Sequence, residues 1–252
     1  WRAEEVLDRV VTEVLKTELP SEMSIEQIRR DFFKKDYWTG EVIQHHKDGH
    51  AIHILGSTVL FKDAQGTPFG VVSVNHDITE RKKAEQAMQA KLEEERIFQN
   101  YLKELHTITI ELTQIDQLDE FYQQTIVLGH SRLGFDRIGL FLYDAQQDVA
   151  LGTFGIDPLG KLSDERLLKF TPAPQGVFRR AFQAAERFCL DEPAPLYHNM
   201  KQIAVGWKAA AVLWSGTQTV GWLITDNLIN QQPATKPQME LFALYALTIG
   251  TL

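Results

Sequence analysis

The feature that most constrains the fold is a strand that runs directly into a long charged helix, in "VVSVNHDITERKKAEQ" (residues 71–86). Apolar residues alternate along the first half of this stretch, which is typical of a strand, and a charged helical pattern follows at once. The helix is expected over residues 80–115, about 36 residues, and would span roughly 54 Å at the usual rise per residue. Asp77 is expected to cap it, with Glu80 supplying the reciprocal bond of a capping box. A connection without a loop predicts a stiff joint between a sheet and a helix.

The second half of this helix carries a heptad pattern. Apolar residues alternate spacings of three and four, which predicts the seam of a coiled-coil homodimer formed by Phe98, Tyr101, Leu105, Ile108, Leu112 and Ile115. In the first half the same register places the charged Lys91 and Glu94 on the seam, while Met88 and Leu92 lie off it. The seam is therefore expected to be weaker near the start of the helix.

Short strands and helices are expected on both sides of the long helix. Upstream, turn signals at 47–49 and around Gly66 separate three predicted strands, 40–46, 50–61 and 69–78. Two helices, 3–15 and 25–33, are expected before them, and Ser24 is expected to cap the second. Downstream, the pattern predicts helices 118–133, 175–186 and 238–252, hairpins 137–155 and 209–226, and a short strand 187–190. Strands that return through hairpins favour an α+β fold with antiparallel sheets over a parallel doubly wound fold.

Composition excludes several classes of function. The net charge of the 252 residues is −8, and an acidic chain without clustered Lys and Arg does not suit nucleic-acid binding. No stretch reaches the roughly 18 apolar residues that a membrane span needs. The single cysteine, Cys189, allows no intrachain disulfide and fits a reducing compartment. We expect a cytoplasmic protein with no nucleic-acid or membrane partner in this segment. Because it starts with Trp1, we also expect it to be an internal piece of a longer protein.

The first third of the sequence resembles a known sensory family. "GEVIQHHKDGHAIHILGSTVLFKDAQGTPFGVVSVNHDITERKKAE" (residues 40–85) resembles the C-terminal part of a PAS domain in its Lys-Asp-Gly turn, its Gly66 loop and its Asp-Ile-Thr-Glu-Arg ending. "WRAEEVLDR" is similar to the helical segment that follows the first PAS strands. The resemblance implies a partial PAS domain over residues 1–79, whose opening strands are missing.

The second half resembles a GAF domain, expected over residues 116–252. The similar stretches are "LGHSRLGFDRIGLFLYD", "LGTFGIDPLGKLSDER" and "VGWKAAAVLWSGTQTVGWLITDNL". The expected architecture is an antiparallel-sheet PAS fragment and a GAF domain joined by a signalling helix, residues 80–115. Together the two resemblances imply the input region of a bacterial signalling protein, such as a histidine kinase or a diguanylate cyclase. Asp77, Thr79 and Glu80 would then relay a signal from the sheet into the helix, towards an effector domain beyond the C-terminus.

Polar and aromatic residues in the middle of the GAF-like half are the candidates for a small-molecule pocket: Arg166, Tyr197, His198, Trp207 and Lys208. The alternative is that they are solvated loop residues, with Trp207 packed on the core. The resemblance does not identify the ligand. Cys189 is followed by Leu190 rather than by the His of bilin-binding GAF domains, and neither the flavin-type cysteine motif nor the cyclic-nucleotide signature is present. We expect no bilin, flavin or haem.

A metal site and an enzymatic site are not predicted. His45, His46, His50 and His53 are close in sequence, but His45 and His46 point to opposite faces of a strand. No acidic or thiolate partner is expected at a suitable spacing. Phosphate-binding loops, nucleophile elbows and the effector motifs of histidine kinases and diguanylate cyclases are absent. The expected function is a sensory input region that binds a small ligand and relays a signal through a helical dimer. The alternative is a dimerisation and relay scaffold without a ligand.

Overall fold

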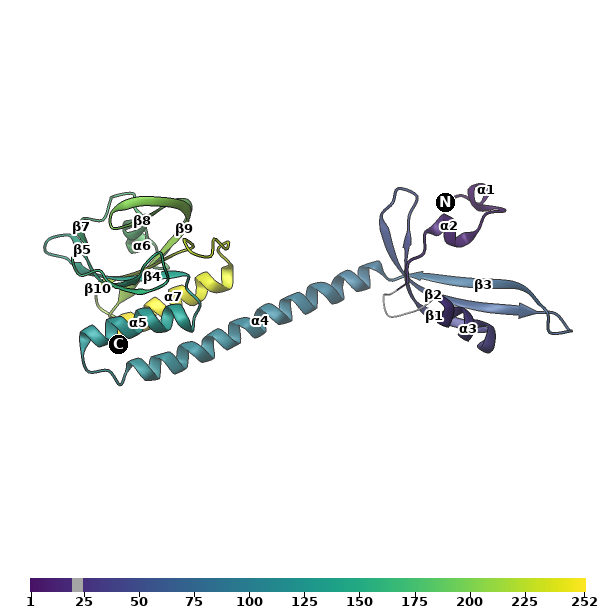
Figure 1. Cartoon of the computed structure of the whole chain (residues 1–252), viewed down its shortest axis with the longest axis horizontal. Coiled ribbons are helices and arrows are strands. Elements are labelled where there is room, and N and C mark those ends of the chain that lie inside the picture. The colour runs from purple at the N-terminus through teal and green to yellow at the C-terminus, as the bar shows by residue number, and fades with distance from the viewer. Residues whose placement is uncertain (20–24) are drawn as a thin grey trace. The chain divides into compact units, whose positions relative to one another are not determined.

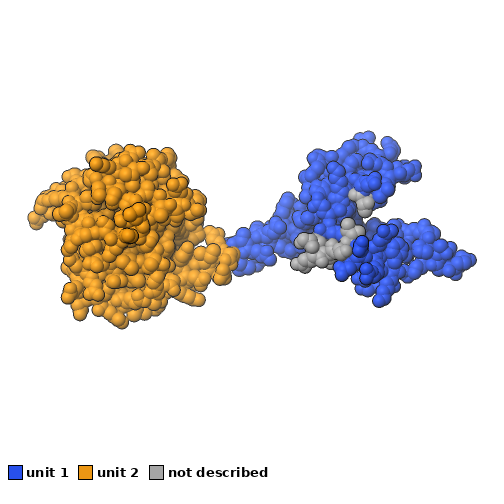
Figure 2. Space-filling view, in the orientation of Figure 1, with its two compact units in different colours: residues 1–92 blue, residues 93–252 orange. Residues whose placement is uncertain are grey.

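The computed structural model describes residues 1–19 and 25–252 (Figure 1). They form two compact units, Trp1–Leu92 and Glu93–Leu252 (Figure 2). The division falls inside helix α4 (Thr79–Leu112), so the first part of α4 belongs to one unit and the second part to the other. Helices and antiparallel sheets in both units confirm the predicted α+β class. Within the described residues, no helix combines the length and the apolar character that crossing a membrane requires.

The first unit contains a three-stranded antiparallel sheet in the order β1-β2-β3. Its elements are α1 (Ala3–Val6), α2 (Val11–Leu15), α3 (Ile25–Lys35), β1 (Tyr37–His45), β2 (Ala51–Lys62) and β3 (Pro68–Asp77). The prediction of one helix over 3–15 is wrong. Asp8 has a φ of 60°, which a right-handed helix does not accommodate, and α1 and α2 lie on either side of it. Ser24, the predicted cap of α3, lies outside the described residues.

The joint between β3 and α4 is hydrogen-bonded to the neighbouring strand β2. Thr79 Oγ1 accepts the backbone N–H of His53 at 2.9 Å, and the N–H of Ile78 donates to the His53 carbonyl at 2.8 Å. Asp77 Oδ1 accepts the N–H of Thr79 at 2.8 Å. Hydrogen bonds from the Thr79 side chain and backbone lower the pKa of Asp77. The start of the helix is therefore held to two strands of the sheet.

The capping box predicted between Asp77 and Glu80 is wrong. The Glu80 carboxylate instead accepts a bond from Lys83, one turn further along the helix, at 3.0 Å. A different carboxylate anchors the first turn: Glu41 of β1 pairs with Arg81 at 2.8 Å and with Lys82 at 2.5 Å. The sequence did not reveal this ion-pair cluster because Glu41 comes from a strand that is distant along the chain.

The second unit is built on a seven-stranded antiparallel sheet. The strand order is β6-β5-β4-β10-β9-β8, and β7 pairs with β5. The elements are α5 (Leu118–Ser131), β4 (Arg137–Asp144), β5 (Val149–Ile156), β6 (Leu162–Asp164), β7 (Lys169–Phe170), α6 (Val177–Gln183), β8 (Phe188–His198), β9 (Lys201–Trp214), β10 (Thr219–Asp226) and α7 (Lys236–Thr251). The strand predicted over 187–190 is longer than expected and forms a hairpin with β9.

Alternation along the strands gives this sheet two different faces. One face packs against the second part of α4, α5 and α7, in a core that includes Phe135, Phe242 and Tyr245. The other face packs against α6 in a smaller cluster that includes Phe141 and Trp222. In Figure 1, α5 and α7 lie together along one side of the sheet. Successive residues of β4, β9 and β10 therefore enter different environments.

The central part of the predicted coiled-coil seam is wrong. Leu105, Ile108 and Leu112 are only 9%, 0% and 1% exposed and form part of the core of the second unit. Tyr101 and Ile115 pack against the same core, while Phe98 stays half-buried. The spacing of three and four residues occurs in any helix with one apolar face. It therefore does not distinguish packing within one chain from packing against a second helix.

Candidate functional site

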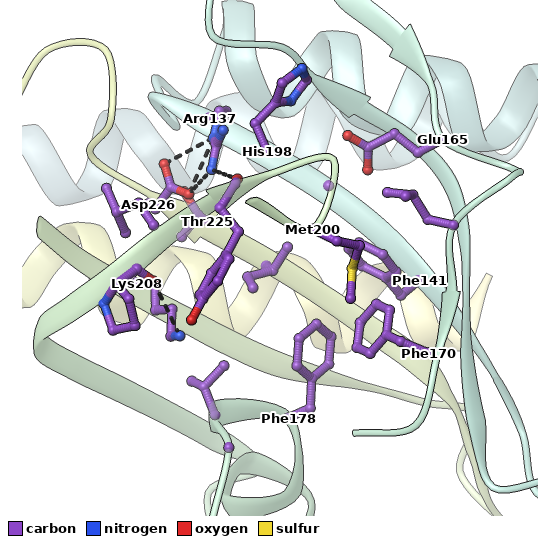
Figure 3. Close-up of a pocket in the computed structure, with 18 of the residues that line it drawn as sticks. Arg137, Phe141, Glu165, Phe170, Phe178, His198, Met200, Lys208, Thr225 and Asp226 are labelled. Atoms are coloured by element: carbon purple, nitrogen blue, oxygen red, sulfur yellow. Dashed lines mark hydrogen bonds and ion pairs between the residues drawn. The ribbon is translucent and has the colours of Figure 1, made fainter. Parts of the chain in front are cut away.

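The second unit contains a pocket with a volume of about 460 Å³ (Figure 3). Its walls come from β4, β8, β9 and β10, from the chain that follows β6, and from the start of α6. It opens on the face of the sheet that carries α6 rather than on the face covered by α5 and α7. The volume lies in the range of sites that bind small molecules.

One wall of the pocket is aromatic. Phe141, Phe170 and Phe178 come from β4, β7 and α6, and their ring centroids lie 5.5 to 5.6 Å apart in edge-to-face contacts. Such contacts are favourable beyond the area that they bury. Trp222 supports them from the sheet, because its Nε1–H donates to the Phe178 carbonyl at 3.1 Å. The three rings form an apolar surface whose shape is set by mutual packing (Figure 3).

The opposite end of the pocket holds a buried ion pair. Arg137 and Asp226 are cross-strand partners of β4 and β10, and their side chains are 11% and 10% exposed. Arg137 Nε donates to both carboxylate oxygens of Asp226, at 3.1 and 3.2 Å, and Nη2 donates to the Tyr197 carbonyl at 2.8 Å. Burial raises the pKa of Asp226, and the guanidinium opposes this effect. The pair fastens the end of β8 to the centre of the sheet (Figure 3).

Lys208 of β9 carries a positive charge that this pair does not neutralise. Its Nζ lies 3.4 Å from the Pro195 carbonyl and 5.5 Å from the centroid of the Tyr197 ring. In the described part of the chain its ammonium forms no ion pair with a carboxylate. Burial lowers the pKa of Lys208, and the nearby charge of Arg180 adds to the effect. An ammonium in this position can bind an acceptor or an anionic group.

Glu165 is a pocket residue that the sequence analysis missed. It follows β6, and its carboxyl lies against two glycines of the sheet. A Cβ placed on Gly155 would lie 2.8 Å from this carboxyl, and one on Gly139 would lie 3.7 Å from it. Burial raises the pKa of Glu165, and the charge of Arg137 opposes it. Glycines inside apolar strands mark places where another group approaches closely. The two glycines of "LGTFG" (residues 151–155) therefore indicated that another part of the chain packs against this strand.

The glycines of β5 give a matched pair of substitutions. Gly155→Ala should cost little stability, because the added methyl meets the flexible end of Glu165, which can move aside. Gly152→Ala should cost more, about 1–3 kcal/mol, because its methyl meets the backbone carbonyl of the same residue. Urea unfolding of both variants measures the difference. Equal losses would show that the Glu165 carboxyl is held in place and does not move aside for the added methyl.

Three of the five predicted pocket residues line the pocket: Tyr197, His198 and Lys208. Trp207 does not, and its assignment to the pocket is corrected. Its side chain is buried in the core on the other face of the sheet, and its Nε1–H donates to the Gln232 carbonyl at 2.8 Å. The residues between the predicted strand 187–190 and the predicted hairpin 209–226 belong to the β8–β9 hairpin. Adjacent residues of a strand point in opposite directions, so Trp207 and Lys208 are on opposite faces.

Arg166 is the second correction. It pairs with Asp119 at 2.8 Å and with Asp164 at 2.5 Å, and its guanidinium lies 5.2 Å from the centroid of the Phe154 ring. Hydrogen bonds from Arg166 lower the pKa of Asp164 to about 2. Phe154 belongs to the core on the face covered by helices. Arg166 therefore lies outside the pocket, while its neighbour Glu165 lines it.

Cys189, the only cysteine of the sequence, lies in β8 outside the pocket lining. It is partly buried and packs against the smaller apolar cluster that contains Phe141 and Trp222. This environment is typical of a cysteine that packs as a small apolar residue.

Comparisons with known proteins give structural neighbours of both predicted types. No protein-family model and no curated protein matches the sequence. A GAF domain from a phosphoenolpyruvate-protein phosphotransferase of Coxiella burnetii is 16% identical, with a TM-score of 0.49, over 61% of this chain and 92% of that one. A PAS domain from Colwellia psychrerythraea is 26% identical, with a TM-score of 0.28, over 32% of this chain and 67% of that one. The chromophore-binding domain of a Stigmatella aurantiaca bacteriophytochrome is 12% identical, with a TM-score of 0.46, over 100% of this chain and 84% of that one. The first two neighbours belong to the two families that the sequence resembles.

Proposed function

We propose that the second unit is a sensory domain that binds a small molecule in the pocket described above. One observation carries this proposal: the pocket combines an aromatic wall with the Lys208 ammonium and the Glu165 carboxyl, and neither group forms an ion pair in the described part of the chain. Convergent polar groups in a largely apolar cavity are what small-molecule sites use to orient a ligand. The chain would be a non-catalytic input region of a cytoplasmic signalling protein.

The lining suggests the chemistry of the ligand. A flat apolar part would pack against Phe141, Phe170 and Phe178, which present ring faces and edges. An anionic or carbonyl group would accept a hydrogen bond from Lys208, and a donor group would bind Glu165. The Arg137–Asp226 pair is already satisfied internally and would shape the pocket rather than hold the ligand.

The proposed relay runs through α4. Thr79 and Asp77 fix the start of the helix to the sheet of the first unit, and Glu41 binds Arg81 and Lys82. A rigid element held in this way transmits a displacement rather than absorbing it. The signal would pass to an effector domain beyond the C-terminus. The chain would act as a homodimer. An interface between two copies would have to use surfaces other than Ile108 and Leu112, which are inside the folded unit.

Native mass spectrometry of the freshly purified chain, with an absorption spectrum of the same sample, tests ligand binding. We expect an additional mass on the wild-type chain and its loss in Lys208→Met, which removes the ammonium and keeps the length of the side chain. Lys201→Met is the matched control, because Lys201 starts the same strand but is exposed and outside the pocket lining. Bare wild-type polypeptide, with no gain in thermal stability when small-molecule extracts are added, would favour the relay scaffold without a ligand.

A further inference from the structure

The hairpin between β1 and β2 brings two histidines and an aspartate together at its tip. The ladder pairs His45 with Ala51, and beyond it the N–H of His46 donates to the His50 carbonyl at 2.9 Å. Cross-strand partners lie on the same face of a hairpin. The imidazole rings of His46 and His50 accordingly stack, with centroids 4.6 Å apart and planes 21° from parallel.

Asp48 lies in the turn between the two histidines and faces both. Its Oδ1 is 3.2 Å from Nδ1 of His46 and 2.5 Å from Nδ1 of His50. The backbone N–H of His50 donates to the same carboxylate oxygen at 3.1 Å and holds it in this orientation. The expectation that no acidic residue has a suitable spacing is wrong, because the turn places the Asp48 carboxylate beside both imidazoles.

We infer that His46, Asp48 and His50 form a binding site for a divalent transition-metal ion. One ligand atom from each residue lies within 4.8 Å of the other two, so a small adjustment around a central ion would bring all three to coordination distance. Two imidazole nitrogens and one carboxylate oxygen suit Zn²⁺, Ni²⁺ or Cu²⁺, whereas Ca²⁺ and Mg²⁺ prefer oxygen ligands. All three side chains are exposed, which leaves the remaining coordination positions open to water.

The site needs little reorganisation to bind an ion. Gly49 has a φ of 93°, a conformation that favours glycine and closes the turn around Asp48. Both histidines present Nδ1 to the carboxylate, so the donor atoms already converge on one point. Binding would link the end of β1 to the start of β2 through side chains, in addition to the backbone ladder.

Titration of the whole chain with Zn²⁺ at pH 7.5, followed by calorimetry, tests the site. We expect one Zn²⁺ per chain, and a loss of affinity of about tenfold or more in His50→Ala, since even groups that only support a metal ligand contribute about 10–100-fold. Asp48→Asn is a second variant, because it keeps the acceptor for the His50 N–H and removes the charge. His106→Ala is the matched control, because His106 is exposed on α4 and away from the hairpin.

Two results would overturn the proposal. One is the absence of saturable binding up to about 1 mM Zn²⁺, because a Kd above this concentration would mean a very weak interaction. The other is equal Zn²⁺ affinity in the wild-type chain, His50→Ala and Asp48→Asn, with unchanged circular dichroism in all three. Because the site lies in the first unit, either result leaves the proposed pocket of the second unit unaffected.

Discussion

Replacing Ile108 by alanine is expected to lower the free energy of unfolding of the second unit by about 2–5 kcal/mol. Ile108 is completely buried in the core that α4 shares with α5, α7 and the sheet, so truncation removes apolar contacts and leaves a cavity in a close-packed core. Urea unfolding monitored by tryptophan fluorescence measures the loss, because Trp207 and Trp222 belong to this unit.

Ile110→Ala is the matched control on the same helix. Ile110 is 47% exposed, so its truncation should change the free energy of unfolding by no more than about 0.5 kcal/mol. Sedimentation of both variants separates this interpretation from the coiled-coil seam predicted from the sequence. A seam at Ile108 would predict that Ile108→Ala dissociates a dimer and leaves the fold of each chain intact. We expect the opposite, a less stable fold and an unchanged oligomeric state.

Removing Arg137 is the second large effect. Arg137→Ala leaves Asp226 buried without its partner, and breaking a buried pair in this way costs about 3–5 kcal/mol. In the double variant Arg137→Met with Asp226→Leu both charges are absent, and we expect much of the stability to return. Arg96→Ala is the control, because Arg96 and its partner Glu93 are exposed on α4, and we expect no measurable change.

The loss in Arg137→Ala should depend on pH. Burial already raises the pKa of Asp226 in the folded protein, and removing the guanidinium raises it further. An unfolded-state Asp has a pKa of about 3.9. When the folded-state pKa of a carboxyl is higher than this, the free energy of unfolding falls as the pH rises from the unfolded-state pKa to the folded-state pKa. The deficit of the variant should therefore be smaller at pH 4 than at pH 7. An equal deficit at both values would indicate that packing, rather than the unpaired carboxylate, accounts for the loss.

The sequence alone determined the elements whose signals are local. Asp48-Gly49 and the Gly66 loop predicted the turns between β1, β2 and β3, because few residues adopt the backbone conformations that such turns require. Alternation and helical spacing predicted most strands and helices of the second unit. The polar and aromatic residues in the middle of the GAF-like half included Tyr197, His198 and Lys208, which line the pocket.

The tertiary structure decided which partner covers each apolar or charged group. Spacing places Ile108 on an apolar face, but only the core that α4 shares with α5, α7 and the sheet shows that this face is covered within one chain. Glu165 reaches the pocket because Gly155 and Gly139 lie on two strands that leave room for it. Asp48 meets His46 and His50 only when the hairpin closes. Periodicity records the orientation of a side chain within its own element, whereas its neighbours come from residues far away in the sequence.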